Sequence, residues 1–91
     1  MIGILVTEMA EIIVYTTNYC PYCVKAKQLL LKKGVEFEEI DLTNDDAARM
    51  ALVEKSGRKT VPQIFINNQH IGGCDDLYDL DAKGELDSLL L

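Results

Sequence analysis

Apolar residues in this chain gather in short blocks whose spacing changes from one block to the next. Residues 12–16, with the sequence IIVYT, are β-branched and aromatic, which is typical of a buried β-strand. Between residues 24 and 31 the apolar positions are interrupted by lysines in a helical pattern. Pro21 fits the first turn of this helix, where its missing N–H needs no partner, and Gly34 ends it.

A second strand and a second helix follow. Residues 35–42 mix apolar with acidic positions and predict a strand. Thr43 or Asn44 can then cap a helix that runs to Gly57, because both side chains accept hydrogen bonds from free N–H groups at a helix start. The apolar face of this predicted helix is formed by Met50, Leu52 and Val53.

The next segment predicts a β-hairpin. Residues 61–66 form a third predicted strand, which Pro62 interrupts near its start, and residues 69–71 form a fourth. Asn67 and Asn68, which lie between the two strands, are typical of a tight turn.

A last helix is predicted after the hairpin, with Asp75 or Asp76 as its cap and Gly84 at its end. Residues 86–91 form a terminal apolar segment. The order of elements is therefore β-α-β-α-β-β-α. A strand-helix-strand unit gives a parallel pair and a hairpin adds antiparallel strands. The predicted fold class is α/β, with a four-stranded mixed sheet flanked by helices.

Length and composition narrow the possible functions. The 91 residues predict one domain, and a hydrophobic fraction of 48% is enough for a core without covalent staples. The net charge of −6 argues against nucleic acid as a partner. No apolar run approaches membrane-spanning length, so we expect no membrane association.

The start of the chain has no basic leader, and Glu8 follows the first apolar residues before any cleavage-like site. We therefore expect a cytoplasmic protein, in a compartment where thiols stay reduced. Residues 1–10 are predicted to be an N-terminal extension, either disordered or packed at a sheet edge, and residues 11–91 to be the domain itself. Met9 offers a second start site.

The chain contains three cysteines and one histidine. An odd number of cysteines argues against a disulfide scaffold, and a structural zinc site would need all four of these side chains. We therefore expect no metal. Cys20 and Cys23 form a Cys-Pro-Tyr-Cys motif between the first predicted strand and helix. At a helix N-terminus the free N–H groups and the dipole favour a thiolate, which can attack a disulfide. The second thiol, one turn on, can resolve the mixed disulfide.

Three motifs together resemble the pattern of dithiol glutaredoxins: Cys-Pro-Tyr-Cys at 20–23, Thr-Val-Pro at 60–62 and Gly-Gly-Cys-Asp-Asp at 72–76. The resemblance covers the chain from about residue 12 onward, and the short bacterial members look nearest. It implies a thioredoxin-like fold in which Pro62 is cis and faces the cysteines. An X–Pro bond adopts the cis form at modest cost.

The resemblance implies that Cys20 is the nucleophile and Cys23 the resolving thiol. It implies a glutathione site formed by Tyr22, Arg49, Thr60, Val61, Pro62, Cys74, Asp75 and Asp76. The backbone around Val61 would pair with the cysteinyl part of glutathione as an added strand does. The N-terminus of the last helix and its aspartates would hold the carboxylate and the ammonium of the γ-glutamyl end. Arg49 would reach the glycine carboxylate.

Some of these residues also have simpler interpretations. Asp75 and Asp76 can act as helix caps, and Arg49 can be a solvated surface residue. Cys74 is either a thiol that glutathione or another chain can modify, or a small, partly buried residue whose backbone alone matters.

One position departs from the family pattern. Thr17 stands where many members have a lysine that would assist thiolate formation and meet a substrate carboxylate. Lys27 can take its place, or the helix N-terminus can suffice alone.

The resemblance implies an enzyme that reduces protein disulfides and glutathione mixed disulfides, with glutathione as co-substrate and no bound cofactor. Its expected partners are glutathione and disulfide-containing or glutathionylated proteins, and we expect a monomer. Two alternatives remain open. One is a dimer that binds an iron–sulfur cluster, which Pro21 disfavours because it stiffens the turn after the nucleophile. The other is a thioredoxin-like reductant served by a flavoprotein reductase.

Overall fold

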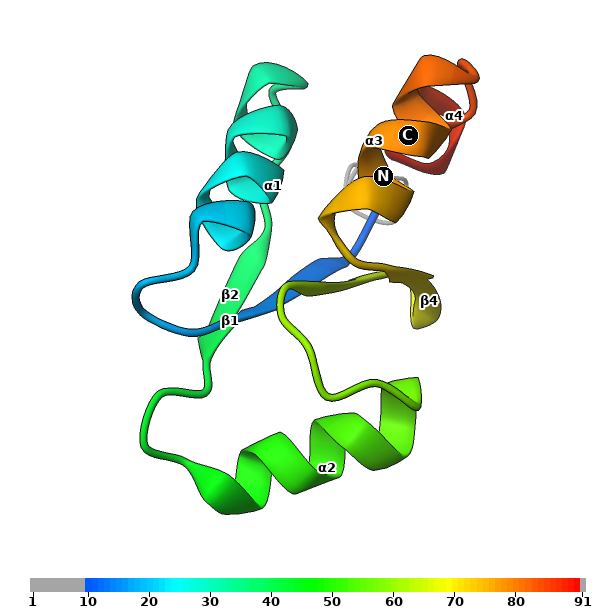
Figure 1. The fold of residues 1–91 in the computed structure, drawn as a ribbon. Helices are drawn as coiled ribbons and strands as arrows, with labels where there is room; N and C mark the ends of the chain where they lie inside the picture. Colours follow the sequence, from blue (N-terminus) through cyan, green and yellow to red (C-terminus); the bar gives the residue numbers. More distant parts are fainter. Residues whose placement is uncertain (1–9, 91) are drawn as a thin grey trace, which may run out of the picture.

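The computed structural model describes residues 10–90, and residues 1–9 and 91 lie outside the described part. The elements follow the order β1 (Ile12–Thr16), α1 (Pro21–Lys32), β2 (Glu38–Asp41), α2 (Asp46–Ser56), β3 (Gln63–Ile66), β4 (Gln69–Gly72), α3 (Cys74–Ala82) and α4 (Leu86–Leu90). Figure 1 shows the path of the chain. The predicted order is confirmed, with α4 as a short addition inside the terminal apolar segment. The expected N-terminal extension falls almost wholly outside the described residues.

The four strands form one mixed sheet in the order β2-β1-β3-β4. β1 runs parallel to β2 and antiparallel to β3, so that Val14 lies between Glu39 and Ile64. β3 and β4 form the predicted antiparallel hairpin, with Phe65 opposite His70. The β1-α1-β2 unit thus gives the parallel pair and the hairpin gives the antiparallel strands.

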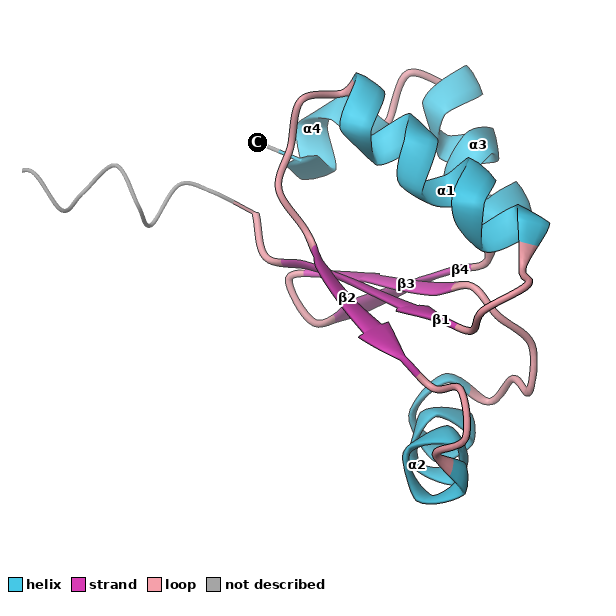
Figure 2. Ribbon diagram, turned by 90° about the vertical axis from the view of Figure 1, so that its left-hand side faces the viewer, coloured by secondary structure: helices cyan, strands magenta, loops and turns pink. Residues whose placement is uncertain are grey.

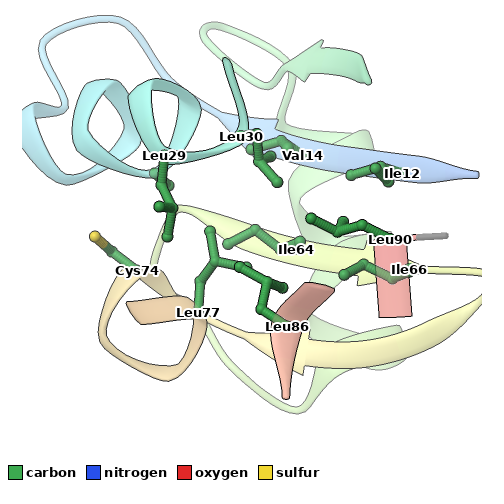
Figure 3. Packing of buried hydrophobic residues seen from close by; sticks show 11 residues of the cluster. Ile12, Val14, Leu29, Leu30, Ile64, Ile66, Cys74, Leu77, Leu86 and Leu90 are labelled. Atoms are coloured by element: carbon green, nitrogen blue, oxygen red, sulfur yellow. The ribbon is translucent and has the colours of Figure 1, made fainter. Parts of the chain in front are cut away.

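Helices cover both faces of the sheet. In Figure 2, α1, α3 and α4 lie on one face and α2 lies on the other. The main core fills the space between the sheet and the first group of helices, where Val14, Leu30 and Leu77 are fully buried (Figure 3). A smaller cluster of Leu42, Leu52 and Phe65 packs under α2. Because the helices lie over the two faces of the sheet, the loops at one end of the sheet are available to form a site.

The second helix differs from its prediction in its cap and in its apolar face. It begins after Asp45, whose carboxylate accepts the Ala48 N–H at 3.0 Å. Thr43 and Asn44 are not the cap, because the chain first makes a turn in which Asn44 adopts a φ of 60°. Met50 is 68% exposed and does not belong to the buried face, which Leu52 supplies.

The second strand and the third helix also begin at other residues than predicted. β2 is confined to four residues, because residues 35–37 have no regular structure and the Val35 N–H still bonds back to the Leu30 carbonyl of α1. α3 begins at Cys74 and its N-cap is Gly73, so neither Asp75 nor Asp76 is the N-cap. Asp76 instead sits one turn in and accepts the Gly73 N–H at 2.8 Å. Among residues 10–90, no helix has the length and apolar character needed to cross a membrane.

Candidate active site

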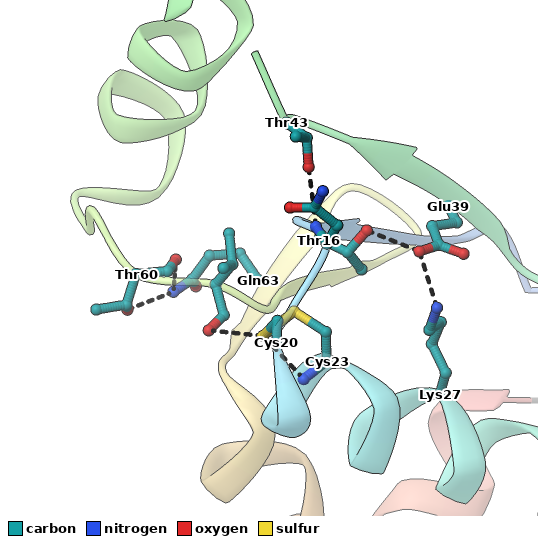
Figure 4. The surroundings of a disulfide bond; sticks show 10 residues. Thr16, Cys20, Cys23, Lys27, Glu39, Thr43, Thr60 and Gln63 are labelled. Carbon is teal, nitrogen blue, oxygen red and sulfur yellow. Dashed lines mark hydrogen bonds and ion pairs between the residues drawn. A yellow bond between two sulfur atoms is a disulfide. The ribbon is translucent and has the colours of Figure 1, made fainter. Parts of the chain in front are cut away.

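Cys20 and Cys23 lie at the junction between β1 and α1. They are joined by a disulfide, with their Cα atoms 5.1 Å apart. Cys20 is the N-cap of α1, and the Cys23 N–H points at its sulfur at 3.1 Å (Figure 4). Cys23 is 2% exposed, whereas Cys20 is half-buried and reachable. After reduction, the helix N–H would stabilise negative charge on the Cys20 sulfur, which makes it the better nucleophile.

The Thr60–Val61–Pro62 segment faces these cysteines from the other side of the site. The Val61–Pro62 peptide bond is cis, as predicted. The Cys20 sulfur lies 3.8 Å from the Val61 carbonyl oxygen. Two segments that are 41 residues apart in sequence therefore meet at the reactive sulfur.

A surface hollow of about 350 Å³ is lined by Val61, the residue whose carbonyl oxygen lies 3.8 Å from the Cys20 sulfur. Of the predicted binding residues, those that line it are Tyr22, Thr60, Val61, Pro62, Cys74, Asp75 and Asp76. The hollow thus joins the start of α1, the cis-proline segment and the N-terminus of α3. The first N–H groups of α3 have no acceptor within the helix, which suits them to an anionic group.

Arg58 also lines this hollow, although no motif or spacing in the sequence singles it out. Its Nη1 donates to Asp76 Oδ2 at 3.0 Å, and the same oxygen accepts the Gly73 N–H. These contacts hold the pKa of the Asp76 carboxyl below its usual value, with the Gly73 N–H as the larger cause and Arg58 as the next. The nearness of Arg58 to the Thr-Val-Pro motif is the one sequence signal that could have suggested it.

Arg49 is not brought to this hollow. It lies on α2, beside Met50, Val53 and Lys59, where these residues line a separate hollow of about 650 Å³. The structure therefore places seven of the eight predicted glutathione-site residues together and sets Arg49 apart.

Lys27 is engaged in an ion pair on the other side of the cysteines. Its Nζ lies 2.9 Å from Glu39 Oε2, which also accepts a hydrogen bond from Thr16 Oγ1 at 2.7 Å (Figure 4). Lys27, together with Thr16, lowers the pKa of Glu39. Lys27 thus already has an anionic partner, which weakens the idea that it replaces the family lysine at Thr17.

Both the sequence and the structure of this chain resemble those of known proteins. The family model described as Glutaredoxin matches residues 12–71. The chain is 57% identical over 82 residues to Glutaredoxin 3 of Escherichia coli, covering 90% of this chain and 99% of that protein. It is 51% identical to a glutaredoxin of Pseudomonas aeruginosa, with 90% and 98% covered. The chain belongs to the glutaredoxin family.

Solved glutaredoxin structures share its fold. A crystal structure of a buckwheat glutaredoxin–glutathione complex superimposes with a TM-score of 0.83 at 34% identity, covering 89% of this chain and 76% of that one. A solution structure of glutaredoxin from Brucella melitensis gives 0.81 at 55% identity, covering 90% and 89%. The thioredoxin-like fold and the glutathione-dependent thiol–disulfide oxidoreductase activity, both predicted, are confirmed for this glutaredoxin at the level of the family.

The third cysteine of this glutaredoxin, Cys74, is 5% exposed and packs against the main core next to Leu29 and Leu77 (Figure 3). Burial raises the pKa of its thiol above the usual value. Both observations favour the interpretation of Cys74 as a small buried residue. Within residues 10–90, no cluster of three or more histidine, cysteine or acidic side chains is arranged to hold a metal ion.

The lowered pKa of Asp76 predicts how its contribution to stability depends on pH. The folded protein favours the ionised form of Asp76. The contribution of Asp76 to stability is therefore complete above the pKa of an unfolded carboxyl, about 4, and is lost as the pH falls through the lower pKa of the folded state. Asp76→Asn should therefore melt below wild type at pH 7, and the two melting temperatures should converge on acidification below about pH 4. Thermal unfolding of both proteins across this range measures it. A gap that does not change with pH would contradict the assignment.

Proposed function

We propose that this glutaredoxin reduces glutathione mixed disulfides and protein disulfides in the cytoplasm, as a monomer without a bound cofactor. The hollow carries the proposal, because it joins the Thr60–Pro62 segment to the N-terminus of α3 and reaches the reactive sulfur at Val61, whose carbonyl oxygen lies 3.8 Å from it. A short, charged peptide that carries a sulfur is the ligand that such a surface suits. A compartment rich in reduced glutathione would supply the electrons.

Glutathione would lie across the hollow with its sulfur at Cys20. The Val61 backbone would pair with the cysteinyl residue in the manner of an added strand. The γ-glutamyl end would reach the N-terminus of α3, where the free N–H groups of Cys74 and Asp75 would donate hydrogen bonds to its carboxylate. The carboxylates of Asp75 and Asp76 would attract the ammonium group of glutathione. The guanidinium of Arg58 would attract a carboxylate of glutathione.

Reduction of a mixed disulfide then takes two exchange steps. The Cys20 thiolate attacks the glutathione sulfur, the old S–S bond breaks, and the protein leaves as a thiolate that takes up a proton. The thiolate of a second glutathione attacks the bound glutathione sulfur, which forms glutathione disulfide and frees Cys20. With a protein disulfide, Cys20 forms a mixed disulfide with one protein sulfur, and Cys23 attacks Cys20 to release the reduced protein. Glutathione reopens the resulting Cys20–Cys23 bond.

The proposal is tested by steady-state turnover of a small glutathione mixed disulfide with reduced glutathione as the variable substrate. We expect saturable turnover that depends on glutathione. Turnover that needs a flavoprotein reductase and ignores glutathione would instead support the thioredoxin-like alternative.

Two arginine variants test how glutathione is held. Arg58→Ala should raise the apparent KM for glutathione by roughly tenfold, the lower end for a charge-assisted contact, because Arg58 is about half exposed. Arg49→Ala is the matched control, since Arg49 lies in the separate hollow on α2. It should leave the KM nearly unchanged. If Arg49→Ala had the larger effect, the assignment made from the sequence would hold and that of Arg58 would not.

A further inference from the structure

Gln63 is a polar side chain in an otherwise apolar and fully buried strand. It opens β3, whose sequence is QIFI, and it is 0% exposed. Alternation along the strand turns Ile64 and Ile66 toward the main core and Phe65 toward the cluster under α2. Gln63 shares the face of Phe65, so its amide lies on the side of the sheet where the loop from α2 arrives. A buried amide is tolerated only where its donors and acceptor find partners.

The amide of Gln63 joins two other segments. Its Nε2 donates to the Thr60 carbonyl oxygen at 3.0 Å and lies 3.3 Å from Thr60 Oγ1 (Figure 4). Its Oε1 lies 2.7 Å from His70 Nε2 on the neighbouring strand β4. A carbonyl oxygen only accepts, so the NH₂ group must face Thr60 and the Oε1 must face the histidine. His70 Nε2 therefore carries the proton and donates it to Gln63.

His70 is held in place by its hydrogen bond to Gln63 and by the ring of Phe65. Its ring packs on the ring of Phe65 with centroids 5.0 Å apart. Burial, with Arg58 nearby, lowers the pKa of His70, while Asp76 acts in the opposite sense. The neutral ring with its proton on Nε2 suits the bond to Gln63.

Thr60 has no strand partner of its own. It lies in the segment between α2 and β3, which has no regular secondary structure at residues 58–60. The next residue is Val61, whose carbonyl oxygen lies 3.8 Å from the Cys20 sulfur. Fixing the Thr60 carbonyl thus fixes the direction in which the backbone passes the reactive cysteine.

We propose that Gln63 and His70 are a positioning pair, which holds Thr60 so that the Val61 backbone and the hollow are ready for glutathione. Neither side chain lines the hollow, so the pair acts through Thr60 and not by touching the substrate. The role rests on the proposed function, because it concerns the binding of glutathione to that same site.

Gln63→Met tests the pair, since methionine has a similar length and cannot make either hydrogen bond. The segment should then relax, and the apparent KM for glutathione should rise roughly tenfold, the change expected for loss of one well-placed contact, with kcat within about twofold of wild type. His70→Phe keeps the ring on Phe65 and removes the donor, so it should shift the KM in the same direction. The double variant should be no worse than Gln63→Met alone, because both changes remove one linkage.

Ile66→Val is the matched control. It removes a methylene from the same strand on the opposite, core-facing side. It should lower the melting temperature and leave the KM for glutathione unchanged. A fall in melting temperature without a KM change in Gln63→Met and His70→Phe would show a purely structural role and overturn the proposal. If wild type itself failed to turn over with glutathione, the proposed function would fail, and that result is distinct from equal KM values in active proteins.

Discussion

Cys20→Ser should reduce turnover of every disulfide substrate to the rate without enzyme. A serine hydroxyl stays protonated at neutral pH and cannot attack a disulfide in the way that a thiolate does. In the structure, the Cys20 sulfur accepts the hydrogen bond of the Cys23 N–H at the start of α1. Cys23 is buried and lies inside the first turn, so it has no access to an incoming substrate. Steady-state assays with a small glutathione mixed disulfide and with a protein disulfide measure the loss.

Cys23→Ser should separate the two substrate classes. Turnover of glutathione mixed disulfides should remain at or above the wild-type rate, because this route needs only Cys20 and free glutathione. Reduction of protein disulfides should lose most of its rate, since the release of the protein needs the resolving thiol. Cys74→Ser is the control and should resemble wild type in both assays, because Cys74 is buried. A Cys23→Ser protein that is inactive on mixed disulfides, together with an impaired Cys74→Ser protein, would contradict these roles.

Gly72→Ala should be the most destabilising of the single changes considered. Gly72 has a φ of 122°, a conformation that residues with a Cβ rarely adopt. A Cβ built there would lie 2.7 Å from Cγ and 2.9 Å from Cβ of Asp76, inside ordinary contact distance. The added carbon would displace the carboxylate that binds the Gly73 N–H and Arg58. We expect a loss of at least about 2 kcal/mol in the free energy of unfolding.

The same variant should also bind glutathione more weakly, because Asp76 and Arg58 line the hollow. Denaturant unfolding and the apparent KM measure the two effects. Gly84→Ala is the control for backbone strain alone, since Gly84 has a φ of 75° and nothing lies within 4 Å of an added Cβ. It should lose only about 1 kcal/mol and keep its KM. Equal losses in both variants would show that the contact with Asp76 is unimportant.

The parts of the fold that local pattern determines could be predicted from the sequence. The strand at Ile12–Thr16 and the helix that opens at Pro21 were found because side-chain shape and a proline at the first turn act within a few residues. The cap of α2 was missed because three residues in a row can cap a helix. The turn before the helix, with Asn44 at positive φ, decides that Asp45 does so.

The sequence could predict only those site residues that belong to its motifs. Motif residues came together at Cys20, but Arg49 was placed with them by family pattern alone, and the structure sets it on another surface. Arg58 and the Gln63–His70 contact depend on how the α2–β3 segment meets β4 and α3. Such contacts join residues that no short window of sequence contains, so periodicity and motif spacing could not indicate them.

We propose that the hollow selects the glutathione half of a mixed disulfide for attack by Cys20. Mass spectrometry of the Cys23→Ser protein after brief reaction with a glutathionylated peptide tests this most directly. Without the resolving thiol, the first adduct on Cys20 is retained and can be weighed. We predict that this adduct is glutathione, with the peptide released as a free thiol. An adduct of the peptide, or equal amounts of both, would contradict the claim.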